Sequence, residues 1–121
     1  IRGYLNVNVV GTFGFDVKLG STTLSTVSSV VISHPKTNSL VDIDFYFTVR
    51  SIGATGSVIG QGYIDVTLGS GAVTPIKIQL IQLSPVAIDT TIDNDFDVLI
   101  NWDSTFSGNI NMTNSKIKIS N

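Results

Sequence analysis

The chain has no cysteine and no glutamate, a single histidine, and few charged residues of either sign, with 7 Lys and Arg against 9 acidic residues. Without cysteine it can form neither disulfides nor thiolate metal sites. One histidine, His34, excludes a histidine-rich metal centre. The net charge of −2 and the scattered cations argue against nucleic acid as a partner. No apolar run approaches the roughly 20 residues of a membrane-spanning helix, so membrane insertion is not expected.

Most of the chain consists of runs in which every second residue is apolar. Turns rich in Gly, Asn and Asp separate these runs. This period of two is typical of β-strands with one buried face, and no segment shows the helical period. The candidate strands are Tyr4–Val10, Phe13–Leu19, Val27–Ser33, Val41–Arg50, Ser57–Leu68, Ile76–Leu83, Val86–Asp89, Phe96–Trp102 and Asn109–Ile119. So many short strands without helices indicate an all-β sandwich or barrel.

The length of 121 residues fits one domain with one core. The chain starts at Ile1 without an initiating Met or a signal-peptide pattern, and it leads directly into a strand pattern. We therefore expect residues 1–121 to be a single domain that forms the C-terminal fragment of a longer protein.

Several residues do not fit a single domain in which each strand has one buried face and one solvent-exposed polar face. Tyr46 and Tyr63 have the opposite phase from their apolar neighbours, so both are expected to face outward. Ile81 and Leu83 lie opposite in phase to the preceding isoleucines. Either a bulge near residues 80 and 81 shifts the register, or part of the outer face contacts a partner. We take Tyr46, Tyr63, Ile81 and Leu83 as candidate binding residues, for a subunit or a receptor.

The two glycines of Gly60-Gln61-Gly62 fall on one face of an expected strand. They mark either a bend or a close approach of another backbone. Trp102 is in phase with Phe96, Val98 and Ile100, which predicts a place in the core.

The densest acidic stretch is residues 89–97, in which Asp93, Asp95 and Asp97 alternate. These carboxylates are a candidate Ca²⁺ site, although Ca²⁺ takes six or more oxygen ligands and the EF-hand pattern is absent. The alternative is a hairpin turn with Asn94 in a left-handed conformation and solvated carboxylates around it, which we favour.

No serine lies in a nucleophile elbow, and His34 has no acidic neighbour in the sequence. We expect a protein that is not an enzyme and needs no cofactor.

Three stretches together resemble a known family. They are Val17–Leu24, Phe47–Gly62 with its Gly-Ala-Thr-Gly turn, and Ala87–Thr91 followed by Phe96–Val98 and Trp102. In this order they resemble the small jelly-roll domain of phage and virus structural proteins, found at the head of fibre, spike or tail components.

The resemblance implies an eight-stranded antiparallel jelly-roll β-sandwich. It also implies a surface-exposed virion component, commonly a homotrimer, that contacts other virion proteins and attaches to a host receptor or glycan. The resemblance implies no catalytic residue in this chain. The alternative is a carbohydrate-binding module or lectin-like domain of a non-viral protein.

Overall fold

A computed structural model describes residues 1–7, 10–32, 35–67, 76–102 and 108–114. These residues form no helix, so none of them belongs to a helix that could cross a membrane. Their nine strands are β1 (Arg2–Val7), β2 (Gly11–Leu19), β3 (Thr22–Ile32), β4 (Lys36–Ser51), β5 (Gly56–Thr67), β6 (Ile76–Ile81), β7 (Val86–Ile88), β8 (Phe96–Trp102) and β9 (Gly108–Asn114). His34 and residues 115–119 of the last expected strand lie outside the described residues.

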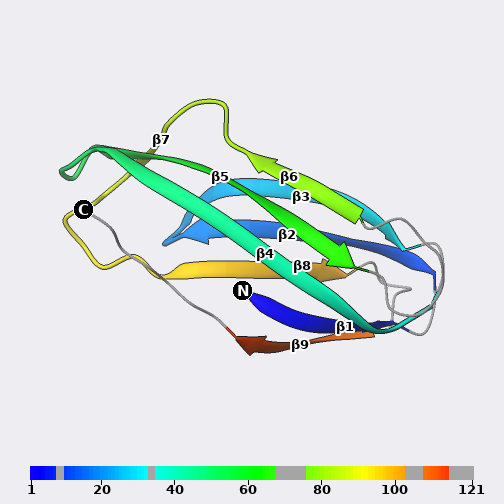
Figure 1. The fold of residues 1–121 in the computed structure, drawn as a ribbon. Helices are drawn as coiled ribbons and strands as arrows, with labels where there is room; N and C mark the ends of the chain where they lie inside the picture. Colours follow the sequence, from blue (N-terminus) through cyan, green and yellow to red (C-terminus); the bar gives the residue numbers. More distant parts are fainter. Residues whose placement is uncertain (8–9, 33–34, 68–75, 103–107, 115–121) are drawn as a thin grey trace.

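The strands form two antiparallel sheets. The larger has six strands in the order β6-β5-β4-β1-β9, with β7 also paired to β5, and the smaller has the order β3-β2-β8. Figure 1 shows β4 and β5 as long diagonal arrows in front of β3, β2 and β8. The all-β architecture expected from the alternation is confirmed, and its sheets are antiparallel. The described part of the chain has nine strands, whereas the resemblance implied eight.

One main core lies between the sheets. Its buried side chains come from six strands of both sheets: Leu5, Val7, Phe13, Phe15, Val17, Val30, Ile32, Val41, Ile43, Ile64, Val66 and Leu80. Removing these apolar surfaces from water is the main term that stabilises the fold. Trp102 packs against this core as predicted, with its ring 5.6 Å from that of Phe13.

A second, smaller cluster closes one end of the molecule, where Leu19, Leu24, Val58 and Ile88 are buried together. The β2–β3 turn at this end contains Gly20, whose φ of 58° suits glycine. The Gly20 N–H donates to the carbonyl of Asp95, 2.7 Å away. The turn is thereby tied to the loop that leads into β8.

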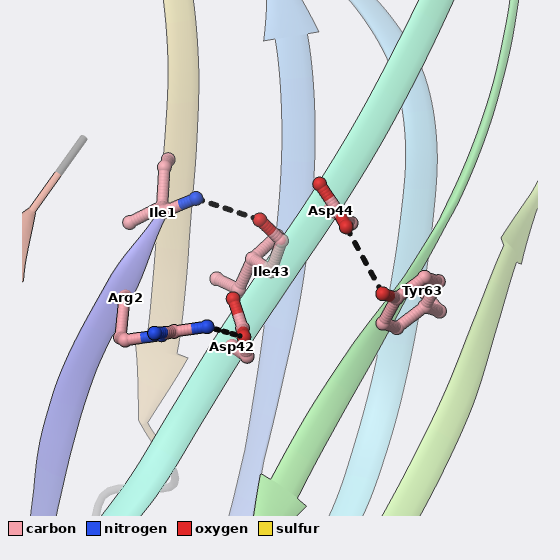
Figure 2. A network of polar contacts seen from close by, with 6 residues as sticks. All are labelled: Ile1, Arg2, Asp42, Ile43, Asp44 and Tyr63. Atoms are coloured by element: carbon pink, nitrogen blue, oxygen red, sulfur yellow. Dashed lines mark hydrogen bonds and ion pairs between the residues drawn. The ribbon is translucent and has the colours of Figure 1, made fainter. Parts of the chain in front are cut away.

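One edge of β4 pairs with another described strand along only part of its length. Ile1 and Ile43 exchange both backbone hydrogen bonds, each 2.7 Å long, and β1 begins at this point (Figure 2). From Asp44 to Ser51, β4 pairs with β5 on its other side and with no other described strand. Among the described residues, the larger sheet therefore has a step where β1 begins.

Candidate functional site

The structure brings three of the four predicted binding residues together on the outer face of the larger sheet. The register places Tyr46 of β4 opposite Gln61 of β5, and Gln61 opposite Ile81 of β6. Tyr46, Tyr63 and Ile81 line one shallow hollow of about 260 Å³. We call the outward side of β4, β5 and β6 the tyrosine face.

Leu83 does not belong to this hollow. It follows the end of β6 and is 92% exposed. Of the two alternatives left open for this stretch, the bulge near residues 80 and 81 is wrong, because β6 pairs with β5 without a register shift. Leu80 is buried in the core and Ile81 points outward, as a regular strand requires.

Tyr63 is held in place by two neighbours. Its hydroxyl donates to Asp44 Oδ2 at 2.9 Å (Figure 2), and Lys77 Nζ lies 4.4 Å from its ring centroid. The hydrogen bond to the Asp44 carboxylate and the charge of that carboxylate raise the pKa of the phenol. Tyr63 therefore stays protonated and acts as a fixed wall of the hollow.

Tyr46 is the exposed aromatic residue of this face. It is 62% exposed and makes no hydrogen bond or ring contact with another described residue. Besides the first hollow, it lines a second of about 140 Å³, which continues over Thr48, Ile59 and Gln82. Its ring thus stands between two adjoining depressions.

Glycines form the floor under these depressions. A Cβ at Gly62 would lie 2.1 Å from the Asp44 carbonyl oxygen and 2.8 Å from the Phe45 Cα. A Cβ at Gly60 would lie 2.5 Å from the Phe45 ring. Of the two explanations for this glycine pair, the close approach therefore applies: the backbone of β4 and the ring of its Phe45 lie directly against the glycines.

Gln82 also lines the second hollow, and it was not predicted from the sequence as a site residue. Its backbone N–H donates to the Gly60 carbonyl at 3.1 Å, and its Oε1 accepts the Gly60 N–H at 2.7 Å. The Nε2 of the same side chain is buried and has no hydrogen-bond partner among the described residues. Gln61 and Gln79 were also missed, although their phase matches that of Tyr63 and Ile81.

Charged residues border the tyrosine face. Arg2 donates to Asp42 Oδ2 at 2.7 Å, and this bond together with the charge of Asp42 raises the pKa of the guanidinium (Figure 2). Asp65 lies opposite Asp42 on one side and Lys77 on the other. Its Oδ1 is buried, with no hydrogen-bond partner in the described part of the chain. Both signs of charge therefore meet at this border.

The acidic stretch does not form the expected hairpin, because it connects β7 in one sheet to β8 in the other. The left-handed conformation expected for Asn94 is wrong. Its Nδ2 instead donates to the carbonyls of Asp89 at 2.8 Å and Ile92 at 3.0 Å, which fixes the loop without a positive φ.

Asp93, Asp95 and Asp97 are exposed. Within the described ranges, no three acidic or histidine side chains gather closely enough to hold a metal ion. The Asp89 carboxylate instead accepts hydrogen bonds from the hydroxyl and the N–H of Thr91. These two bonds lower the pKa of Asp89.

Comparison with known proteins found no matching family model, no matching curated protein and no matching solved structure. The function therefore has to be argued from the tyrosine face itself.

Proposed function

We propose that this chain is a non-enzymatic structural domain of a virus particle and that its tyrosine face attaches to a host glycan. The observation that carries the attachment is the exposed Tyr46 ring, which stands between two shallow depressions on a rigid sheet. A sugar ring has apolar C–H faces that stack on such an aromatic surface.

The polar groups around Tyr46 suit the same kind of ligand. Gln61 and Gln79 offer amide donors and acceptors beside the ring. Sugar hydroxyls both donate and accept hydrogen bonds, which matches side-chain amides. These groups stand on paired strands, so little ordering is needed on binding.

The assignment to a virus particle rests on the resemblance of three stretches of the sequence. The jelly-roll topology is part of this proposal, and the nested pairing of β1 with β9 and of β2 with β8 supports it. The direct pairing of β2 with β3 departs from the usual jelly-roll order, in which most consecutive strands alternate between sheets. Many copies on a particle would turn weak single contacts into firm attachment.

The test of attachment is glycan binding by the chain and two matched variants. Tyr46→Ala is expected to weaken binding about tenfold or more, because it removes the stacking surface. Tyr4→Ala is the control, since Tyr4 is also exposed on the outer side of this sheet but lines neither depression. Binding that survives Tyr46→Ala, or that both variants lose alike, would contradict the proposal.

A second candidate function is a carbohydrate-binding module of a non-viral protein. It is favoured by one observation: residues of a single chain make both depressions, so one copy suffices for binding. A chain that binds glycans with full affinity as a monomer, and that does not associate with any virion component, would support this candidate.

A further inference from the structure

The two depressions of the tyrosine face follow one another along the strands. The first lies over two rows of paired residues, of which one contains Tyr63 and the other contains Tyr46 and Gln61. The second lies over the row of Tyr46 and Gln61 and over the next row, in which Thr48 is opposite Ile59. Tyr46 and Gln61 therefore line both depressions and lie on the boundary between them.

The spacing of the depressions follows from strand geometry. Successive side chains on one face of a strand are two residues apart, which corresponds to about 6.6 Å. The depressions are offset by one such step along β4 and β5, which run side by side (Figure 1). An extended glycan chain advances by a similar length with each sugar ring. Two neighbouring rings of one chain can therefore occupy the two depressions at once.

The depressions are lined by uncharged residues. Within the described part of the chain, their lining consists of tyrosine, glutamine, glycine, isoleucine and threonine. The charges next to the first depression are of opposite sign, and Tyr63 engages both: Asp44 accepts its hydroxyl, and Lys77 lies over its ring. An anionic sugar would have to lose water without gaining an opposite charge in the lining, which is unfavourable. The lining therefore favours an uncharged ligand.

We propose that the ligand of the tyrosine face is an uncharged glycan chain of at least two sugar rings, which lies along β4 and β5 with Tyr46 between the rings. This inference rests on the proposed attachment function and specifies its ligand. The first depression takes one ring, beside Tyr46 and Tyr63. The second takes the adjoining ring, over Thr48 and Ile59.

The two depressions offer different contacts to the two rings. The first, of about 260 Å³, has two tyrosine rings for stacking and the amides of Gln61 and Gln79 for hydrogen bonds. The second, of about 140 Å³, adds the apolar side chain of Ile59 and the hydroxyl of Thr48. The larger depression is therefore the principal site, and the smaller adds contacts that only a longer chain reaches.

A second ring is expected to increase the affinity strongly. The entropy lost when a free ligand is immobilised is lost once, on binding of the first ring. The contacts of a second ring that is covalently joined to the first then add to the affinity almost in full. Because both depressions lie on hydrogen-bonded strands, little ordering of the protein opposes this gain.

The first test is NMR titration of the 12.9-kDa chain with neutral sugars of increasing length. The probes are glucose, galactose, mannose and N-acetylglucosamine, each as the methyl glycoside and as the linear disaccharide and trisaccharide. In a series that binds, the disaccharide is expected to bind about tenfold or more tightly than the monosaccharide. Equal affinity for the monosaccharide and the disaccharide would overturn the proposal.

The same titration shows where the second ring lies. The amide signals of Thr48 and Ile59 are expected to shift with the disaccharide and to stay in place with the monosaccharide. This readout uses the original chain and does not depend on the folding of any variant. Absence of these shifts with a bound disaccharide would contradict the two-ring arrangement.

The second test separates the depressions with two variants. Gln79→Ala removes an amide of the first depression and is expected to weaken binding of the monosaccharide and the disaccharide alike. Thr48→Ala removes side-chain atoms of the second depression. It is expected to weaken disaccharide binding about threefold and to leave monosaccharide binding unchanged. A Thr48→Ala variant that weakens both ligands alike, or neither, would overturn the proposal.

The matched control is Thr67→Ala. Thr67 is an exposed threonine of β5 in phase with Gln61 and Tyr63, but it lines neither depression. This variant is expected to keep both affinities. A loss of disaccharide binding equal to that in Thr48→Ala would indicate a general effect on the sheet and would contradict the assignment of Thr48.

An acidic disaccharide tests whether the ligand is uncharged. The probe is the bound disaccharide with a uronic acid in place of one sugar, prepared in each order of the two rings. Both acidic forms are expected to bind more weakly than the neutral parent. Tighter binding of either acidic form would overturn the proposal.

These outcomes separate the inference from the proposed function. If a monosaccharide binds, is lost in Tyr46→Ala and is bound as tightly as longer chains, the attachment function stands and the two-ring inference is wrong. If no glycan binds at any length, the attachment function is itself wrong, and the inference is wrong with it.

Discussion

Single side chains on the tyrosine face differ in how firmly they are held. Tyr63 is held by Asp44 and Lys77, whereas Tyr46 is 62% exposed and makes no hydrogen bond or ring contact with another described residue. Tyr63 gives the hollow its shape, and Tyr46 provides the exposed surface. This division suits recognition, because a rigid wall lowers the entropy lost on binding.

The closest packing at residue scale is found at Gly62. Gly62→Ala is expected to lower the free energy of unfolding by about 2 kcal/mol or more, because its Cβ would overlap backbone atoms of Asp44 and Phe45 that cannot move aside. Chemical denaturation measures this loss. The neighbouring variant Gln61→Ala is the control and is expected to change stability little, since Gln61 is exposed.

The outward direction of Tyr46 and Tyr63 could be predicted from the sequence because the period of a strand fixes which side chains share a face. The roles of Gln82 and Asn94 could not. Gln82 fills the gap on the edge of β5 between β6 and β7, which exists only once three strands are assembled. Asn94 bonds to carbonyls of its own loop, and no periodicity marks such bonds.

At the scale of elements, two turns distant in the sequence are joined at one end of the sandwich. Thr90, after β7, accepts the N–H of Gly53 through its Oγ1 at 2.8 Å, and its own N–H donates to the Gly53 carbonyl at 3.1 Å. The β4–β5 turn is therefore anchored to the loop between the two sheets.

Thr90→Val is expected to loosen this connection, because valine keeps the shape of threonine but leaves the Gly53 N–H without its acceptor. The expected loss is about 1 kcal/mol, with faster amide exchange at Gly53. Thr55→Val, in the exposed tip of the same turn, provides the comparison. Equal exchange rates at Gly53 in both variants would show that the side-chain bond does not hold the turn.

The sequence predicted the presence of each strand more accurately than its first and last residues. β8 begins and ends at the predicted residues, because Phe96, Val98, Ile100 and Trp102 keep one apolar phase along its whole length. β3 begins at Thr22 rather than Val27, and β4 begins at Lys36 rather than Val41. The added residues are mostly polar, so their pairing depends on neighbouring strands and leaves no hydrophobic period. The order of strands depends on the same long-range contacts.

At the scale of the whole molecule, hydrogen bonds to Asp16 make stability depend on pH. Thr26 of β3 and Asn101 of β8 each donate to this carboxylate at 2.8 Å, which ties all three strands of the smaller sheet together. These bonds, that of Thr26 first, lower the pKa of Asp16 below its ordinary value of 3.8. Its pKa is thus lower in the folded chain than in the unfolded one.

It follows that the Asp16 bonds stabilise the fold above the unfolded pKa, and that this stabilisation is lost as the pH falls through the folded pKa. Asp89 acts in the same direction through Thr91. Denaturation from neutral pH down to about pH 2 is expected to show a shallower loss of stability in Asp16→Asn than in the original chain. An unchanged acid profile in this variant would argue against the assignment. Asp97→Asn removes a carboxylate with no hydrogen bond to a described residue and serves as the control.

The position of Trp102 has a practical consequence for all of these measurements. It is the single tryptophan of the chain, and its ring packs against Phe13 in the smaller sheet, away from the tyrosine face. Its fluorescence therefore reports whether the two sheets are packed together, independently of ligand contacts on the tyrosine face. Each variant carries an internal optical probe that separates loss of binding from loss of folding.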